Sequence, residues 1–92
     1  MAVVKKVEEK KVSFVLDAPN ANKVMLAGSF NEWDYKKAVL KKNKNKTWKK
    51  EVALKPGRHE YKFVVDGNWI SDPSNNNKAV NSFGSENSVI EI

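Results

Sequence analysis

The fold is decided by the stretch RHEYKFVVD at residues 58–66, which leads into GNW at residues 67–69. Side chains along a β-strand point alternately to its two faces, so every second residue shares a face. One face of this stretch is apolar and carries Tyr61, Phe63 and Val65. The Asp66-Gly67 pair that follows is typical of a tight hairpin turn. The stretch therefore predicts a strand with one face in the core and with Lys62 on the outer surface of the sheet.

Shorter stretches on both sides have the same strand character. Residues 11–16 and 23–28 predict two strands before it, and residues 88–92 predict a closing strand. Residues 36–41 predict one more short strand, whereas the Asn- and Ser-rich residues 71–82 predict a long loop. Between these segments, Trp48 shares one face of an expected strand with Val52 and Leu54, which places Trp48 in the core.

Turn signals separate these segments, at residues 17–20, 42–46 and 56–57. Nowhere does an apolar stripe with a period of 3.6 residues persist, which argues against long helices. Several short strands spaced by turns are typical of an all-β antiparallel sandwich.

The size of the chain predicts one domain spanning residues 1–92, in which residues 1–10 form a tail or an edge strand. No apolar run approaches the roughly 20 residues of a transmembrane helix, and the N-terminus has no apolar signal-peptide stretch. The chain contains no cysteine, so disulfides and thiolate metal sites are excluded. These features favour a cytoplasmic protein, although a domain from a secreted enzyme would look the same.

The net charge of +6 raises the question of nucleic acid or a membrane surface. Arginine, which is preferred for bidentate contacts to phosphate and guanine, occurs only once, at Arg58. Many lysines alternate with Asn and Glu, as on a solvated surface. The charge therefore leaves single-stranded nucleic-acid binding as an alternative, with aromatic side chains as platforms for bases.

Two tryptophans stand where strands run into polar turns, Trp33 in GSFNEWD at residues 28–34 and Trp69 after the Asp66-Gly67 turn. A sugar ring can stack its C–H face on an indole while its hydroxyls bond to polar groups at the edge. A sandwich could bring the two turns together, with Lys62 nearby. Gly84 permits a sharp bend that would point Phe83 outward. This pattern predicts a sugar-binding module.

Four motifs carry a family resemblance: GSFNEWD at 28–34, PGRHEYKFVVDGNW at 56–69, DP at 72–73 and FGSENSVI at 83–90. They resemble the glycogen-binding domain of AMP-activated protein kinase beta subunits. More broadly, they are similar to carbohydrate-binding module family 48, found also at the front of isoamylases and branching enzymes. The resemblance covers roughly residues 11–92. It implies an immunoglobulin-like (early-set) antiparallel β-sandwich that binds α-glucan without catalysis and without a cofactor.

The resemblance also implies which residues bind sugar. Trp33 and Trp69 match the two stacking tryptophans of the family. Lys62 matches the lysine that bonds to glucose hydroxyls, and Asn87 matches an asparagine whose amide both donates and accepts.

Two further positions depart from the pattern of the kinase subunits. Ser85 stands where they have threonine, and its hydroxyl can still form a hydrogen bond. Phe83 stands where they have leucine, an apolar finger against the sugar chain. A larger, flat ring there can stack instead or favour another chain curvature, so the departure concerns fine specificity.

Other interpretations of single residues remain open. Each tryptophan could pack into a loop, Asn87 could serve the 85–88 bend, and Phe83 could cap the core. His59, the only histidine, has no partner for a metal site, so no metal is expected. Asp66 and Asp72 are both expected in turns, which argues against a glycosidase carboxylate pair and against an enzyme.

The alternative function is a scaffold or protein-interaction domain of a glucan-metabolising enzyme or kinase complex, without sugar binding of its own. The expected partners are an α-glucan and a fused or associated glucan-active enzyme or kinase. Neither nucleic acid nor a membrane is expected as a partner.

Overall fold

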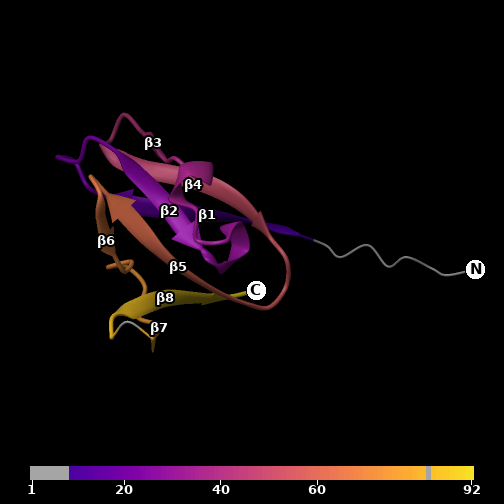
Figure 1. Ribbon diagram of the computed structural model, residues 1–92. Coiled ribbons are helices and arrows are strands. Elements are labelled where there is room, and N and C mark those ends of the chain that lie inside the picture. The colour runs from indigo at the N-terminus through magenta and orange to yellow at the C-terminus, as the bar shows by residue number, and fades with distance from the viewer. Residues whose placement is uncertain (1–8, 83) are drawn as a thin grey trace, which may run out of the picture.

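The structure is a computed structural model of the chain and describes residues 9–82 and 84–92. Within these residues the chain forms β-strands and two short 3-10 helices but no α-helix (Figure 1). The elements in chain order are β1 (Lys10–Asp17), β2 (Val24–Gly28), η1 (Ser29–Asn31), η2 (Tyr35–Lys37), β3 (Lys41–Lys42), β4 (Thr47–Leu54), β5 (Arg58–Val65), β6 (Asn68–Ile70), β7 (Lys78–Val80) and β8 (Glu86–Glu91).

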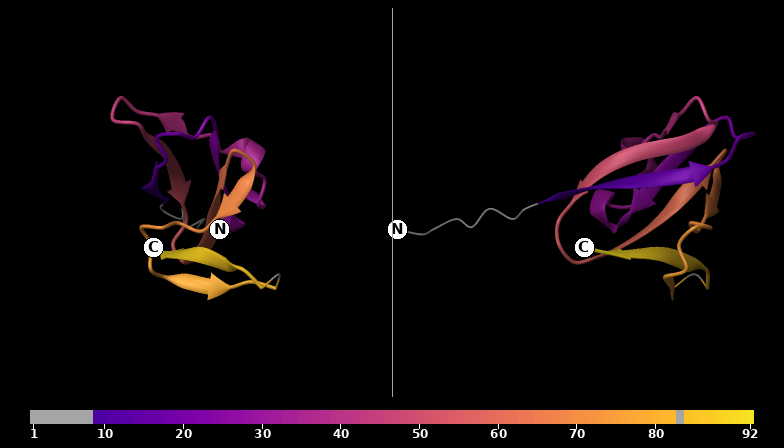
Figure 2. Two further views of the ribbon diagram at one scale, coloured as in Figure 1. Left: turned by 90° about the vertical axis from the view of Figure 1, so that its left-hand side faces the viewer. Right: turned by 180° about the vertical axis from the view of Figure 1, so that it is seen from behind.

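The strands form two antiparallel sheets. The first has the order β1-β4-β3, and the second has the order β2-β5-β8-β7 with β6 paired to β5. Figure 1 shows β2 and β5 toward the viewer, and the view from behind in Figure 2 shows β1 and β4 in front of them. The expected all-β, immunoglobulin-like antiparallel sandwich is confirmed.

Strand β5, the stretch that decides the fold, is the centre of the second sheet. One of its edges pairs with β2, from Gly28↔Tyr61 to Val24↔Val65. Its other edge is shared, with the first half paired to β8 and the last three residues paired to β6. Because β5 pairs on both edges, it determines where β6 and the β7–β8 pair lie in the sheet.

The core lies between the sheets and contains the predicted apolar face of β5, although Val65 is only partly buried. On the opposite face Val64 is buried as well, which the alternation did not predict. Tyr61 and Phe63 are buried, and the ring of Phe14 from the facing sheet lies edge-on to Tyr61 with 4.9 Å between centroids. Trp48 is also buried, and its Nε1 donates a hydrogen bond to the Ala18 carbonyl at 2.8 Å. The prediction that Trp48 belongs to the core is confirmed.

The prediction of a strand at residues 36–41 is wrong. Residues 35–37 form a 3-10 turn, which Asp34 caps by accepting from the Lys36 amide at 3.1 Å. Residues 38–40 then run along the edge of β2, bridging Met25 to Val39, before β3 pairs with β4. The segment therefore crosses from one sheet to the other, which period-2 reasoning about a single strand cannot anticipate.

The predicted loop at residues 71–82 also needs correction, because Lys78–Val80 form strand β7 against β8. Three residues with one β-branched side chain in an Asn-rich stretch give little strand signal. The other predicted strands are confirmed with small shifts, since the closing strand begins at Glu86 and β5 ends at Val65. Residues 1–8 of the predicted tail or edge strand lie outside the described residues.

Candidate functional site

Trp33 lies in a tight turn that directly follows β2. The 3-10 helix η1 ends at Asn31, and the two residues that follow, Glu32 and Trp33, have positive φ angles of 58° and 59°. Left-handed backbone costs residues other than glycine on the order of 1–3 kcal/mol each, and such residues gather at functional sites. The Trp33 amide donates to the Gly28 carbonyl at 2.9 Å and closes the turn. The backbone that carries the half-buried Trp33 side chain is thus fixed.

Two other residues keep this turn in shape. Asn31 Oδ1 accepts from the Gly28 amide at 2.9 Å, and Asn31 Nδ2 donates to the Leu26 carbonyl at 3.1 Å. Gly28 has no space for a side chain, because a Cβ atom there would lie 2.4 Å from the Phe30 ring and 2.8 Å from the Glu60 carbonyl oxygen. The motif around Trp33 is therefore a locally determined unit.

Trp69 lies on β6, opposite Val64 of β5. The preceding Asp66 and Gly67 have φ angles of 48° and 86°, the two positive values that a type I′ hairpin turn requires. The Trp69 side chain is 45% exposed. The Tyr35 ring meets it edge-on at 5.9 Å, with an interplanar angle of 89°. A residue of the segment after Trp33 therefore supports the second indole.

Lys62 occupies the outer face of β5, as the alternation predicts, but only 9% of it is exposed. Its Nζ donates to Ser85 Oγ at 2.8 Å, because the segment that carries Ser85 lies over it. The expectation of a lysine on an open sheet surface is therefore wrong in this respect. The ammonium is tethered at the side of the cavity described below.

Asn87 lies on β8 and is nearly buried, with 7% exposed. Its Nδ2 donates to Glu60 Oε1 at 3.1 Å, and its Oδ1 accepts from Asn81 Nδ2 at 3.1 Å. Each end of this amide thus has one protein partner. One N–H hydrogen and one oxygen lone pair remain, which suits an amide that both donates to and accepts from a ligand.

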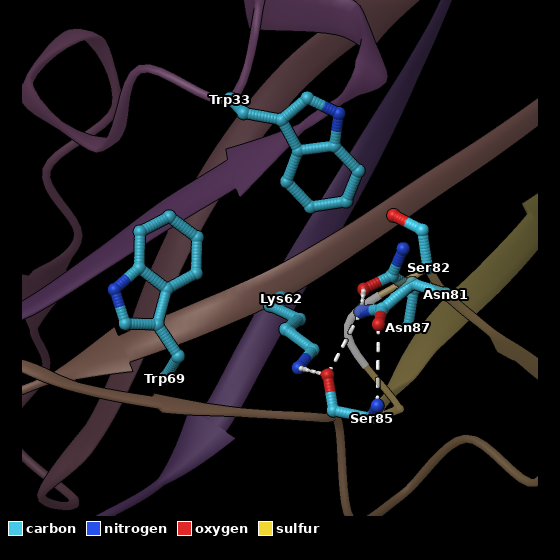
Figure 3. A pocket seen from close by; sticks show the side chains of 7 residues that line it. All are labelled: Trp33, Lys62, Trp69, Asn81, Ser82, Ser85 and Asn87. Carbon is cyan, nitrogen blue, oxygen red and sulfur yellow. Dashed lines mark hydrogen bonds between the residues drawn. The ribbon is translucent and has the colours of Figure 1, made fainter.

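These side chains border one open cavity of about 520 Å³. Figure 3 shows the indoles toward one side and the polar cluster toward the other, with the Lys62 chain reaching from between the indoles toward Ser85. The lining residues are Trp33, Lys62, Trp69, Asn81, Ser82, Ser85 and Asn87. Segments far apart in the chain therefore meet in a hollow with aromatic faces and a polar border.

One predicted site residue, Phe83, lies outside the described residues. Its neighbour Gly84 has a φ of 80°, and the Gly84 amide donates to the Asn81 carbonyl at 3.2 Å. The sharp bend expected at Gly84 is thus present.

The two carboxylates considered as a glycosidase pair have structural partners. Asp66 accepts hydrogen bonds from the amides of Asn22 and Lys23 and joins two turns. Asp72 accepts from the Tyr61 hydroxyl at 2.7 Å. Burial raises the pKa of the Tyr61 phenol, and the hydrogen bond to Asp72 raises it further. Both carboxylates therefore serve the fold.

The histidine and possible metal ligands give no sign of a reactive site in the part of the chain that the structure describes. His59 Nε2 contacts the Lys55 carbonyl at 2.7 Å, so this nitrogen carries the proton and donates it. Within residues 9–82 and 84–92, no three acidic, histidine or cysteine side chains come together as a metal site. The helical turns of this same part of the chain include no membrane-spanning segment.

Sequence reasoning missed three residues around the cavity, Tyr35, Asn81 and Ser82. Tyr35 gave no signal because its contact with Trp69 depends on the misassigned segment after Asp34. Asn81 could have been found, since Asn at the first and Gly at the fourth position are typical of a β-turn, and residues 81–84 fit that pattern.

The sequence that forms this cavity is similar to sequences of known proteins. Residues 12–92 match the family described as the glycogen recognition site of AMP-activated protein kinase. The chain belongs to this glycogen recognition family. The resemblance inferred from the motifs is therefore confirmed, and the match includes every residue that borders the cavity.

Relatives of this glycogen recognition domain come from plants and animals. It is 31% identical to protein FLOURY ENDOSPERM 6, chloroplastic, of Oryza sativa subsp. japonica over 88 residues, which cover 96% of this chain and 16% of that protein. Identity is 40% over 75 residues with protein PTST homolog 2, chloroplastic, of Arabidopsis thaliana, covering 80% and 14%. Identity with the human 5'-AMP-activated protein kinase subunit beta-2 is 32% over 71 residues, covering 77% and 25%. The chain thus spans a quarter or less of these relatives.

Proposed function

We propose that this chain binds α-glucans such as glycogen, starch and maltooligosaccharides, without catalysing a reaction on them. The observation that carries the proposal is the shared cavity, where Trp33 and Trp69 meet Lys62, Ser85 and Asn87. Indole faces supply apolar area for the C–H face of a glucose ring. The ammonium, hydroxyl and amide at the border supply partners for its hydroxyls.

The expected affinity is modest. Each aromatic contact contributes on the order of 1 kcal/mol, by analogy with aromatic pairs in proteins. A short glucan then binds with a Kd in the micromolar-to-millimolar range, which corresponds to roughly 4–8 kcal/mol. A branched polymer offers many chain ends, so several modules on one particle would gain avidity.

The test is a tryptophan-fluorescence titration with maltoheptaose or β-cyclodextrin, supported by affinity electrophoresis in glycogen. We expect quenching with wild type and no response with Trp69→Ala, because the exposed indole is a stacking face. Dextran, a glucan of different linkage, is the matched control ligand. An unchanged affinity of Trp69→Ala would contradict the assigned site.

The salt dependence of binding separates this function from nucleic-acid binding. A neutral glucan displaces no counterions, so its Kd should be nearly the same at low and high salt. A single-stranded nucleic acid that binds through the lysines would lose affinity steeply as salt rises. Tight, salt-sensitive binding to an oligonucleotide together with no response to maltoheptaose would replace the glucan proposal.

A second candidate function is a role in a larger assembly, because similar segments form a quarter or less of the relatives above. On this hypothesis the chain places a fused or associated glucan-active enzyme or kinase on its substrate particle. Scaffolding without sugar binding predicts that the Trp69→Ala variant keeps every partner contact and that wild type fails to bind glycogen. A cytoplasmic location stays a prediction, and two of the relatives are named as chloroplastic proteins.

A further inference from the structure

We propose that Asn81 is a positioning residue of the glucan site, which fixes the hydrogen-bonding atoms that Ser85 and Asn87 present to the ligand. This inference rests on the function proposed above and adds a residue to it. Asn81 lies between β7 and β8, at the first position of the turn that carries Ser85.

The orientation of the Asn81 amide follows from a backbone group. The Ser85 backbone N–H donates to Asn81 Oδ1 at 3.2 Å, and only an oxygen can accept there. The other branch of the amide must then be the NH₂ group. This group faces Ser85 Oγ at 2.8 Å and Asn87 Oδ1 at 3.1 Å.

The orientation of the Asn81 amide also determines the orientation of the Asn87 amide. Since Asn81 donates to the Asn87 oxygen, the Asn87 NH₂ group must point the other way. It does so, donating to the Glu60 carboxylate at 3.1 Å. A directed chain of hydrogen bonds therefore runs from the Ser85 backbone to Glu60, and a reversed amide at either asparagine would set two like groups against each other.

Ser85 gains a fixed polarity in the same way. Its Oγ accepts from Lys62 Nζ and from Asn81 Nδ2, both at 2.8 Å. A hydroxyl oxygen has two lone pairs, and these two donors engage both. The hydroxyl hydrogen is then directed at a third group, so Ser85 acts as a donor toward a sugar oxygen in the cavity.

The consequence is a cavity border that offers mainly donors. Lys62 has two further N–H hydrogens, Ser85 has its O–H, and Asn87 has one N–H beside one lone pair. Sugar hydroxyl oxygens are matching acceptors. Without Asn81 the Ser85 hydroxyl keeps only Lys62 and the Asn87 amide keeps only Glu60 as a partner. Both groups are then held less firmly, and part of the binding free energy is spent on ordering them.

The experiment is calorimetric titration of maltoheptaose into five chains: wild type, Asn81→Ala, Asn81→Asp, Ser85→Ala and the double variant Asn81→Ala with Ser85→Ala. Asn76→Ala is the matched control, because Asn76 lies in the same Asn-rich segment, is exposed and does not line the cavity. Thermal unfolding of each chain checks that it folds.

We expect Asn81→Ala to bind about tenfold more weakly than wild type, the usual size of a lost buried hydrogen-bond partner. Asn81→Asp has the same shape but presents oxygen where the NH₂ group was, so it should lose at least as much. The double variant should lose less than the product of the two single losses, because Asn81 acts partly through Ser85. Asn76→Ala should stay within twofold of wild type.

Two results would overturn the inference while leaving the function intact: Asn81→Asp within twofold of wild type, or losses that multiply in the double variant. The first would mean that shape alone matters, and the second that Asn81 merely holds the loop. If Asn81→Ala fails to fold, the isosteric Asn81→Asp alone decides. A wild-type chain that binds no maltoheptaose overturns the proposed function, and the inference with it.

Discussion

The two tryptophans of the cavity are held in different ways. Trp33 lies in a turn with left-handed backbone, closed by its own amide and braced by Asn31. Trp69 lies on a three-residue edge strand and is 45% exposed, with the Tyr35 ring against it. Local hydrogen bonds thus fix the backbone of Trp33, whereas a hairpin and a side-chain contact position Trp69. The position of Trp33 therefore depends on its own turn, and that of Trp69 depends also on the Tyr35 ring.

Gly28→Ala, in the turn that carries Trp33, should have the largest effect on stability. Gly28 has an extended backbone with φ of −163°, so the problem is space and not strain. The new Cβ would meet the Phe30 ring and the Glu60 carbonyl oxygen. We expect a loss of about 3 kcal/mol in the free energy of unfolding, as for overpacked cores.

Urea denaturation measures this loss, and Gly67→Ala is an informative control. An added Cβ at Gly67 meets no atom within 4 Å, so its cost would come from its φ of 86° alone. Equal stability of Gly28→Ala and wild type would contradict the close approach described for this turn.

Asn31→Ala should have a smaller effect on stability and a larger one on binding. It removes the acceptor of the Gly28 amide and the donor to the Leu26 carbonyl, at a cost of about 1–2 kcal/mol. Since these bonds shape the Trp33 turn, we expect maltoheptaose affinity to fall while far-ultraviolet circular dichroism stays the same. Asn20→Ala, in an exposed turn between β1 and β2, is the control. Unchanged affinity would show that the turn is not what positions Trp33.

Tyr35→Ala should have the smallest effect and should act on the other indole. The edge-on ring pair is worth about 0.5–1.5 kcal/mol, and the substitution removes this contact with Trp69. We expect a few-fold weaker binding to maltoheptaose and a loss of about 0.5–1.5 kcal/mol in the free energy of unfolding. Tyr35→Phe keeps the ring and should bind like wild type. If Tyr35→Ala also binds like wild type, Trp69 needs no support from this side.

The sequence was sufficient to predict the elements that depend on alternation and turn chemistry. The strand at 58–66 and its Asp66-Gly67 turn were predicted because their patterns are local. The strand placed at 36–41 failed because residues 38–42 pair with two different sheets. Strand β7 was not predicted, because three residues between Asn77 and Asn81 are too few to show an alternating pattern of apolar and polar side chains.

The candidate site shows the same limit. The motifs around Trp33 and Trp69 identified the aromatic residues, and the family resemblance supplied Lys62, Ser85 and Asn87. What the sequence could not supply is the set of contacts among them. Asn81 gains its place only when the 81–85 turn lies over Lys62, and the burial of Lys62 itself depends on that tertiary contact.

The most direct test of the account follows the three indole N–H signals in ¹H–¹⁵N NMR spectra while maltoheptaose is added. Trp48 is an internal control, because its buried N–H is bonded to the Ala18 carbonyl on the far side of the core. If one glucan contacts both indoles, the Trp33 and Trp69 signals will shift together along one saturation curve while the Trp48 signal stays in place. Movement of only one of the two, or separate affinities for them, would contradict a single glucan site shared by both indoles.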